Sequence, residues 1–278
     1  MSKDKIVCPV CFRHCALFEG QTGVCRARQN QGGKSIDLNY GKITSMALDP
    51  IEKKPLARFC PGTQILSVGS FGCNLNCPFC QNCGISRVGE DGAPWKYVSP
   101  EGLADLAERL KERGNIGAAF TYNEPMVGFE YVRDAAKAVR ERGLKTVVVT
   151  NGSAEPEILR EVLPYIDAFN IDLKGFTAAW YEKLGGDFAT VLGFITEAAK
   201  VSHVELTTLI VPGENDGVDE MRELSQWVAS VDRDIPLHIT RFFPRHRMRN
   251  KLPTDVALLY RLAEVAQEKL HTVLVGNV

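Results

Sequence analysis

The sequence predicts an α/β protein built as a partial (β/α)6-type TIM barrel, preceded by an N-terminal cysteine-rich extension. From about residue 64 onward, short apolar runs rich in β-branched residues alternate with segments of helical periodicity. This alternation is typical of parallel strands joined by right-handed helical crossovers. No Gly-x-Gly-x-x-Gly motif follows the first strand, so the main reason to prefer a dinucleotide-binding sheet is absent. We therefore expect two parts, the extension at 1–63 and the barrel at 64–278.

The first expected helix has clear signals at both ends. Ser99 and Pro100 precede it, apolar residues recur at three- and four-residue spacing, and Gly114 ends it. In chain order, the expected strands cover 65–68, 118–121, 146–149, 168–172, 204–210, 237–240 and 272–275. The expected helices cover 101–113, 127–142, 155–163, 190–201, 218–231 and 254–270.

Composition narrows the class of protein. The 278 residues are 45% hydrophobic and 24% charged, and a formal net charge of −1 does not favour nucleic acid or an anionic membrane. The nine cysteines are clustered and too few for a disulfide scaffold, which indicates metal binding in a reducing compartment. No apolar signal segment follows Lys5, and the uncharged stretch 59–86 is too polar to insert into a bilayer. We expect a cytoplasmic protein without nucleic-acid or membrane partners.

Three cysteines in the loop after the first strand indicate the chemistry. Cys73, Cys77 and Cys80 have Cys-x3-Cys-x2-Cys spacing, which can hold three irons of a [4Fe–4S] cluster and leave the fourth iron open. A zinc site, which usually uses paired Cys-x2-Cys units, and three free thiols are the alternatives. The motif, with the aromatic Phe79 before its third cysteine, resembles that of the radical S-adenosylmethionine (SAM) superfamily. In that superfamily the amino and carboxylate groups of SAM chelate the open iron.

The resemblance extends over nearly the whole chain. It is closest to the radical SAM enzymes of AmmeMemoRadiSam systems, which are relatives of pyruvate formate-lyase activating enzyme. The segments that carry it are 40–42, 49–56, 120–125, 171–174 and 275–277.

This resemblance implies a reaction but no particular substrate. A radical SAM enzyme cleaves SAM reductively to methionine and a 5′-deoxyadenosyl radical, which would abstract hydrogen from a protein or a small molecule. The electron would come from a low-potential donor such as flavodoxin or ferredoxin. A glycyl-radical activase is the alternative within this chemistry. A non-catalytic zinc-binding protein is the alternative outside it.

Polar residues after successive strands are the candidates for SAM binding, because loops at the carboxyl ends of barrel strands converge on one rim. The resemblance places Phe79 there and implies that the backbone of the segment after the second strand meets the SAM amino group. That segment contains Tyr122, Asn123 and Glu124. A polar loop closed by a proline is the plainer interpretation.

Three further strand ends carry candidates. Asn151 and Gly152 are either an ordinary turn or a source of backbone and amide donors for SAM. Asp172 and Lys174 lie two residues apart on one strand end and so share one face. They could be an ordinary surface pair. The resemblance implies instead that Lys174 meets the SAM carboxylate and that Asp172 holds Lys174 or SAM. His238 is either a core histidine or, by resemblance, a contact of the SAM ribose.

The extension holds a second set of cysteines. Cys8, Cys11, Cys15 and Cys25 fall within eighteen residues, which is a strong metal signal. Structural zinc, a second iron–sulfur cluster and no metal all remain open, and His14 could replace one cysteine.

Overall fold

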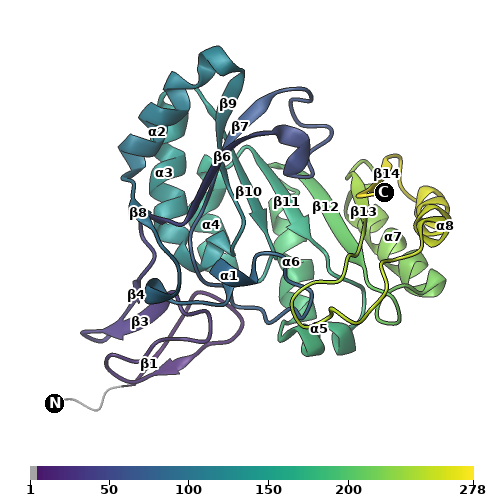
Figure 1. Cartoon of the computed structure of the whole chain (residues 1–278), viewed down its shortest axis with the longest axis horizontal. Coiled ribbons are helices and arrows are strands. Elements are labelled where there is room, and N and C mark those ends of the chain that lie inside the picture. Colours follow the sequence, from purple (N-terminus) through teal and green to yellow (C-terminus); the bar gives the residue numbers. More distant parts are fainter. Residues whose placement is uncertain (1–4) are drawn as a thin grey trace.

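The computed structural model describes residues 5–278 and contains an eight-stranded central sheet (Figure 1). The strand order is β14-β13-β12-β11-β10-β9-β7-β6, and all neighbours are parallel except β6 and β7. The expected α/β fold with a parallel, partial barrel is confirmed. The strands are β6 (Ser45–Pro50), β7 (Gln64–Gly69), β9 (Asn115–Phe120), β10 (Lys145–Thr150), β11 (Ala168–Asp172), β12 (His203–Ile210), β13 (Leu237–Arg241) and β14 (Val273–Gly276).

Helices join successive parallel strands, as the alternation predicts. They are α2 (Pro100–Arg109), α3 (Phe129–Glu141), α4 (Pro156–Val162), α6 (Phe188–Ala198), α7 (Val218–Asp232) and α8 (Val256–Gln267). Capping sets their ends: the Asp187 carboxylate accepts a hydrogen bond from the Thr190 N–H, so α6 begins two residues before the expected start. Short 3-10 turns lie at η1 (Ile51–Lys53), η2 (Glu90–Gly92), η3 (Lys111–Arg113), η4 (Pro125–Gly128) and η5 (Leu163–Tyr165).

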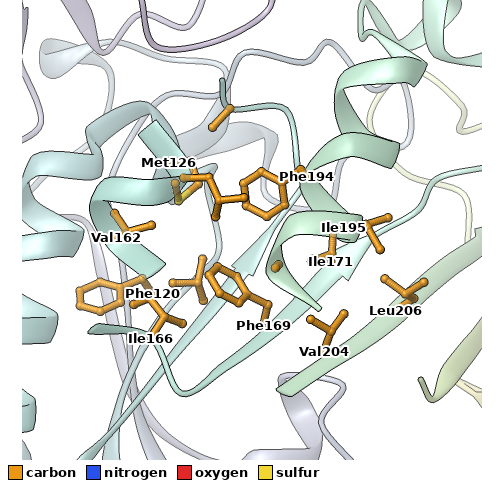
Figure 2. Close-up of a cluster of buried hydrophobic side chains, with 14 of the residues drawn as sticks. Phe120, Met126, Val162, Ile166, Phe169, Ile171, Phe194, Ile195, Val204 and Leu206 are labelled. Carbon is orange, nitrogen blue, oxygen red and sulfur yellow. The ribbon is translucent and has the colours of Figure 1, made fainter. Parts of the chain in front are cut away.

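The main hydrophobic core lies between the sheet and its covering helices. Figure 2 shows side chains from β9, β11 and β12 packed against α4, α6 and η4. The rings of Phe169 and Phe194 meet edge to face at 5.9 Å between centroids. Because strand residues alternate, Phe169 and Ile171 face this core while Asn170 and Asp172 face the barrel interior. The same strand therefore supplies both packing and polar groups for a site.

Part of the predicted extension belongs to the barrel. Residues 45–50 form β6, which pairs antiparallel with β7 at the sheet edge. The following residues fill the barrel interior, where Ile51 and Leu56 pack against Ile65, Ala119 and Val147. The sequence did not indicate this because the segment has neither helical nor strand periodicity over a useful length.

The rest of the extension consists of short hairpins. They contain β1 (Ile6–Val7), β2 (Ala16–Leu17), β3 (Arg28–Gln31) and β4 (Lys34–Asp37), while β5 (Lys42–Ile43) pairs with β8 (Lys96–Tyr97). In Figure 1, β1, β3 and β4 lie at the lower left of the view, and the short helix α1 (Cys83–Ser86) lies above them, nearer the middle of the molecule. Within residues 5–278, no helix has the length and apolar content needed to cross a membrane.

Candidate functional site

A cavity of about 300 Å³ lies at the carboxyl ends of the parallel strands. It is lined by the three cysteines of the loop after β7, together with residues that follow β9, β10 and β11. The sequence candidates that line it are Cys73, Cys77, Phe79, Cys80, Tyr122, Asn123, Glu124, Asn151, Asp172 and Lys174. Gly152 and His238 do not line it. The structure thus brings most of the predicted residues together.

The cysteine loop is anchored on both sides. At Gly72, φ is +91°, and a Cβ there would lie 2.6 Å from the carbonyl oxygen of Cys25, so only glycine fits without displacing backbone. The next residue, Cys73, donates its backbone N–H to the same carbonyl at 3.1 Å. On the other side, Phe79 stacks on Trp180 with 6.1 Å between ring centroids. The loop is therefore held between the N-terminal extension and the barrel.

The three thiols suit a cluster with one open position. All three are free, Cys77 is buried, and Cys73 and Cys80 are half-buried. Burial raises the pKa of Cys77 to about 11, although Lys174 opposes this rise. Burial also raises the pKa of Cys73, and Glu124 adds to the effect. In residues 5–278 no fourth cysteine lines this cavity, so the donor set is three soft ligands beside room for a further group.

The segment after β9 supports the cysteine loop. The Asn123 side-chain N–H₂ donates to the carbonyls of Phe71 (3.1 Å) and Gly72 (3.2 Å), and its oxygen accepts the Ser70 N–H at 2.9 Å. Asn123 thus fixes the start of the loop through its side chain, whereas the resemblance implied only a backbone role for this segment.

Tyr122 is held by a buried ion pair. Its φ is +73°, and its hydroxyl donates to Asp49 Oδ2 at 2.7 Å. The Lys54 ammonium lies 2.9 Å from the same oxygen and 4.6 Å from the centroid of the Tyr122 ring. Burial alone would raise the pKa of Asp49, but Lys54 and Tyr122 lower it to about 2. The Asp49–Leu56 segment, which carried part of the resemblance, therefore has a physical role at the site.

Glu124 links the ends of β9 and β10. Its buried carboxylate accepts hydrogen bonds from the Thr150 hydroxyl (2.6 Å), the Asn151 N–H (2.7 Å) and the Met126 N–H (3.0 Å). Burial raises its pKa to about 7 even though these donors lower it. In turn, the Asn151 side chain donates to Asn74 Oδ1 at 2.9 Å and lies 3.7 Å from Cys73 Sγ. Glu124 therefore orients Asn151 toward the cysteine loop.

Lys174 presents a charged ammonium to the cavity. Its Nζ lies 2.7 Å from Asp172 Oδ2, and its side chain is 13% exposed. Burial lowers its pKa, but Asp172 and Cys77 more than compensate, so the pKa is raised. The short helix α5 (Ala178–Leu184) fixes the Lys174 backbone, because Tyr181 Oη accepts its N–H at 3.0 Å and Trp180 Nε1 donates to its carbonyl at 2.8 Å.

His238 is engaged elsewhere. Its Nε2 lies 2.6 Å from Glu205 Oε2, and Glu205 also contacts His203 at 2.9 Å. The same carboxylate accepts the backbone N–H groups of Ala57 (2.9 Å) and Arg58 (2.7 Å). Burial would raise the pKa of Glu205, but these partners lower it to about 2. Glu205 therefore ties residues 57 and 58 to the barrel wall, and His238 is one of its partners.

The N-terminal cysteines gather at a separate place. Cys8, Cys11, Cys15 and Cys25 line one small enclosed cavity beneath the cysteine loop. His14 is not among its lining residues; its Nε2 lies 3.3 Å from Glu155 Oε1.

The sequence missed several residues of the site. Asn74 accepts from Asn151, Trp180 and Tyr181 support Lys174, and Asn277 lines the cavity with φ at +61°. The run Thr177–Gly185 held a usable signal for α5: Thr177 caps it and Gly185 ends it in the left-handed conformation. A helix of seven residues is too short to show clear periodicity.

Comparisons of sequence agree with this geometry. The model of the radical SAM superfamily matches residues 67–227. An uncharacterised protein of Methanocaldococcus jannaschii is 38% identical over 100% of this chain and 83% of that protein. Pyruvate formate-lyase-activating enzyme of Clostridium pasteurianum is 25% identical over 70% of this chain and 80% of that enzyme.

Solved structures share the fold. A domain of a pyruvate-formate lyase-activating enzyme from Bacteroides vulgatus has a TM-score of 0.51 at 18% identity, over 58% of this chain and 99% of that one. Streptococcus suis SuiB bound to S-adenosylmethionine has a TM-score of 0.60 at 15% identity, over 77% of this chain and 52% of that one. The match over residues 67–227, more than half of the sequence, shows that the chain belongs to the radical SAM superfamily.

Proposed function

We propose that the protein is an enzyme that cleaves SAM reductively and uses the resulting radical on a protein or small-molecule substrate. One observation carries the proposal: three free thiols, a buried carboxylate and a charged ammonium line one cavity in a chain of this superfamily. When bound there, a [4Fe–4S] cluster and SAM would supply one-electron cleavage to methionine and a 5′-deoxyadenosyl radical that abstracts hydrogen.

Different residues of the chain would bind the cluster, bind SAM and orient the groups around them. Cys73, Cys77 and Cys80 would hold the cluster. Lys174 would bind the SAM carboxylate, because its ammonium faces the cavity and its pKa is raised. Glu124 would act as a positioning residue, since its carboxylate is already filled by three donors and sets the direction of Asn151. Holding the reacting groups in fixed relative positions lowers the barrier of such a reaction.

The enzyme subtype and the class of substrate are also part of this proposal. The five segments described above favour an enzyme of an AmmeMemoRadiSam system. Similarity to the Clostridium enzyme supports a glycyl-radical activase as the second candidate. A protein substrate also fits SuiB, which has been solved with a precursor peptide. Nine free cysteines favour a reducing compartment, and we place the protein in the cytoplasm.

Arginine side chains beside the cysteine loop favour an acidic protein, such as flavodoxin or ferredoxin, as the electron donor. Arg247 donates from its side chain to the Asn76 carbonyl at 2.5 Å and from its backbone to the Pro78 carbonyl at 2.9 Å, so it lies on the cysteine loop. Arg87 bonds the Leu75 carbonyl; burial lowers its pKa, and so do Arg26 and Arg247. Several cations thus converge beside the loop, and this arrangement favours a partner with an acidic surface.

Iron content and EPR spectroscopy test the proposal. Anaerobically reconstituted wild type should bind about four irons per chain, and the EPR spectrum of its reduced cluster should change when SAM is added. Cys77→Ala should lose this signal, whereas Cys83→Ala, a free cysteine outside the motif, should keep it. Equal spectra for wild type and Cys77→Ala would refute the assignment. A stable glycyl radical on an added glycyl-radical enzyme would favour the activase.

A further inference from the structure

The four N-terminal cysteines converge although they come from different turns. Cys8, Cys11 and Cys15 lie in and beside the hairpin of β1 and β2, and Cys25 lies in the turn before β3. The backbone N–H of Cys8 donates to the carbonyl of Cys15 at 2.9 Å, which closes the first turn. All four are free thiols, and three of them are buried. Four thiols around one enclosed space, three of them buried, form a specific ligand set.

The size of the cavity discriminates between the possible occupants. Its volume is about 10 Å³, which is close to the space that one water-sized sphere needs. A single ion fits such a space, whereas a cubane cluster of eight heavy atoms would require the four cysteines to move further apart. The other lining residues are Val10, Arg13, Gly23, Arg28 and Val127, so no carboxylate or imidazole competes with sulfur.

The surroundings suit a thiolate site with a net negative charge. Burial raises the pKa of Cys11 and raises that of Cys25 to about 11; the backbone N–H of Arg13 opposes the rise at Cys11, and those of Ala27 and Arg28 oppose it at Cys25. Such donors orient and stabilise metal-bound thiolates. Arg28, which is 3% exposed, also lines the cavity, and its guanidinium pairs with Glu130 Oε2 at 2.6 Å. Zn²⁺ binds such sites more tightly than Fe²⁺ does, and four sulfurs match its tetrahedral preference.

We infer that Cys8, Cys11, Cys15 and Cys25 bind one structural Zn²⁺, which fixes the backbone that supports Cys73. Within residues 5–278, no three ligand side chains are already at the spacing of a single-ion site. Binding therefore requires the thiols to rotate toward the centre of the cavity.

The site is linked directly to the catalytic loop. The Cys25 carbonyl accepts the Cys73 N–H at 3.1 Å, and Arg13 Nε donates to the Asn74 carbonyl at 2.7 Å. Cys11 also forms a β-bridge with Ala154, close to Asn151 in the chain. An ion that immobilises Cys11 and Cys25 would thus steady two walls of the larger cavity. The link to catalysis rests on the proposed function, but zinc binding itself does not.

Metal analysis of anaerobically purified, reconstituted protein, never exposed to chelator, tests the site. We expect about one zinc per chain, and zinc X-ray absorption should show four sulfur neighbours at about 2.3 Å. Cys11→Ser and Cys25→Ser should each lose at least half of the zinc. The matched control is Cys60→Ser, because Cys60 is a free, half-buried thiol that lines neither cavity.

Several results would overturn the inference. The inference would be wrong if the wild-type protein contained no zinc, or if X-ray absorption showed mainly nitrogen or oxygen neighbours around the zinc. Iron beyond four per chain that disappears in Cys25→Ser would assign the thiols to a second cluster instead. The absorption measurement needs no variant, so it stands even if a variant fails to fold, and none of these readouts depends on SAM cleavage. An EPR spectrum of the reduced cluster that is the same in zinc-free Cys25→Ser and wild type would overturn the link to Cys73.

Discussion

Replacing Lys174 with methionine tests how the cavity binds SAM. The substitution keeps most of the side-chain length and packing but removes an ammonium that is 13% exposed. A charge-assisted hydrogen bond from this ammonium to a carboxylate contributes about 1.5–3 kcal/mol. Since about 1.4 kcal/mol corresponds to a tenfold change, Lys174→Met should weaken SAM binding roughly ten- to a hundredfold. Iron content should stay the same, because no cluster ligand is altered.

Titrating SAM against the EPR change of the reduced cluster measures this affinity. The matched control is Lys183→Met on α5, because Lys183 is 66% exposed, pairs with Glu214 and does not line the cavity. The control should bind SAM as the wild type does. An unchanged affinity in Lys174→Met would refute the carboxylate contact and leave Lys174 as the partner of Asp172 alone.

Three further variants test neighbouring parts of the account. Glu124 has a pKa of about 7 in the fold and about 4.3 when unfolded, so the wild type should lose stability as pH rises between these values. In Glu124→Gln, the free energy of unfolding, measured with urea, should depend less on pH over this range. An equal pH dependence in the variant and the wild type would contradict the burial argument. Asp49→Asn leaves the buried Lys54 ammonium without its carboxylate and should lower the free energy of unfolding by about 3–5 kcal/mol; a loss under about 1 kcal/mol would argue against the ion pair. Arg247→Ala should slow reduction by an acidic flavodoxin and weaken its dependence on salt; an unchanged salt dependence would place the donor elsewhere.

The barrel could be predicted because its signals are local. Each parallel strand of the central sheet is a short, largely apolar run, and each long helix has a periodic apolar face, so both can be recognised in the sequence without knowledge of contacts. The strand ends then follow from topology, since parallel strands place their carboxyl ends on one rim. For this reason Cys73, Glu124, Asn151 and Lys174 were expected near one another, and all line one cavity.

The remaining features depend on contacts between distant segments. Nothing near His238 in the sequence shows that Glu205 binds it, or that the same carboxylate accepts the backbone N–H groups of Ala57 and Arg58. Likewise, the carbonyl of Cys25 meets Cys73 only because the extension folds under the cysteine loop. Strand β6 was not expected because residues 45–50 carry a proline and an aspartate, which are uncommon in strands.

Formation of 5′-deoxyadenosine most directly tests the central claim that Cys73, Cys77 and Cys80 support radical SAM chemistry. The protein is reconstituted anaerobically with iron and sulfide, reduced in the presence of SAM, and assayed for 5′-deoxyadenosine. The wild type should form it, and Cys77→Ala should form none. A Cys77→Ala protein that forms 5′-deoxyadenosine at the wild-type rate would contradict the claim.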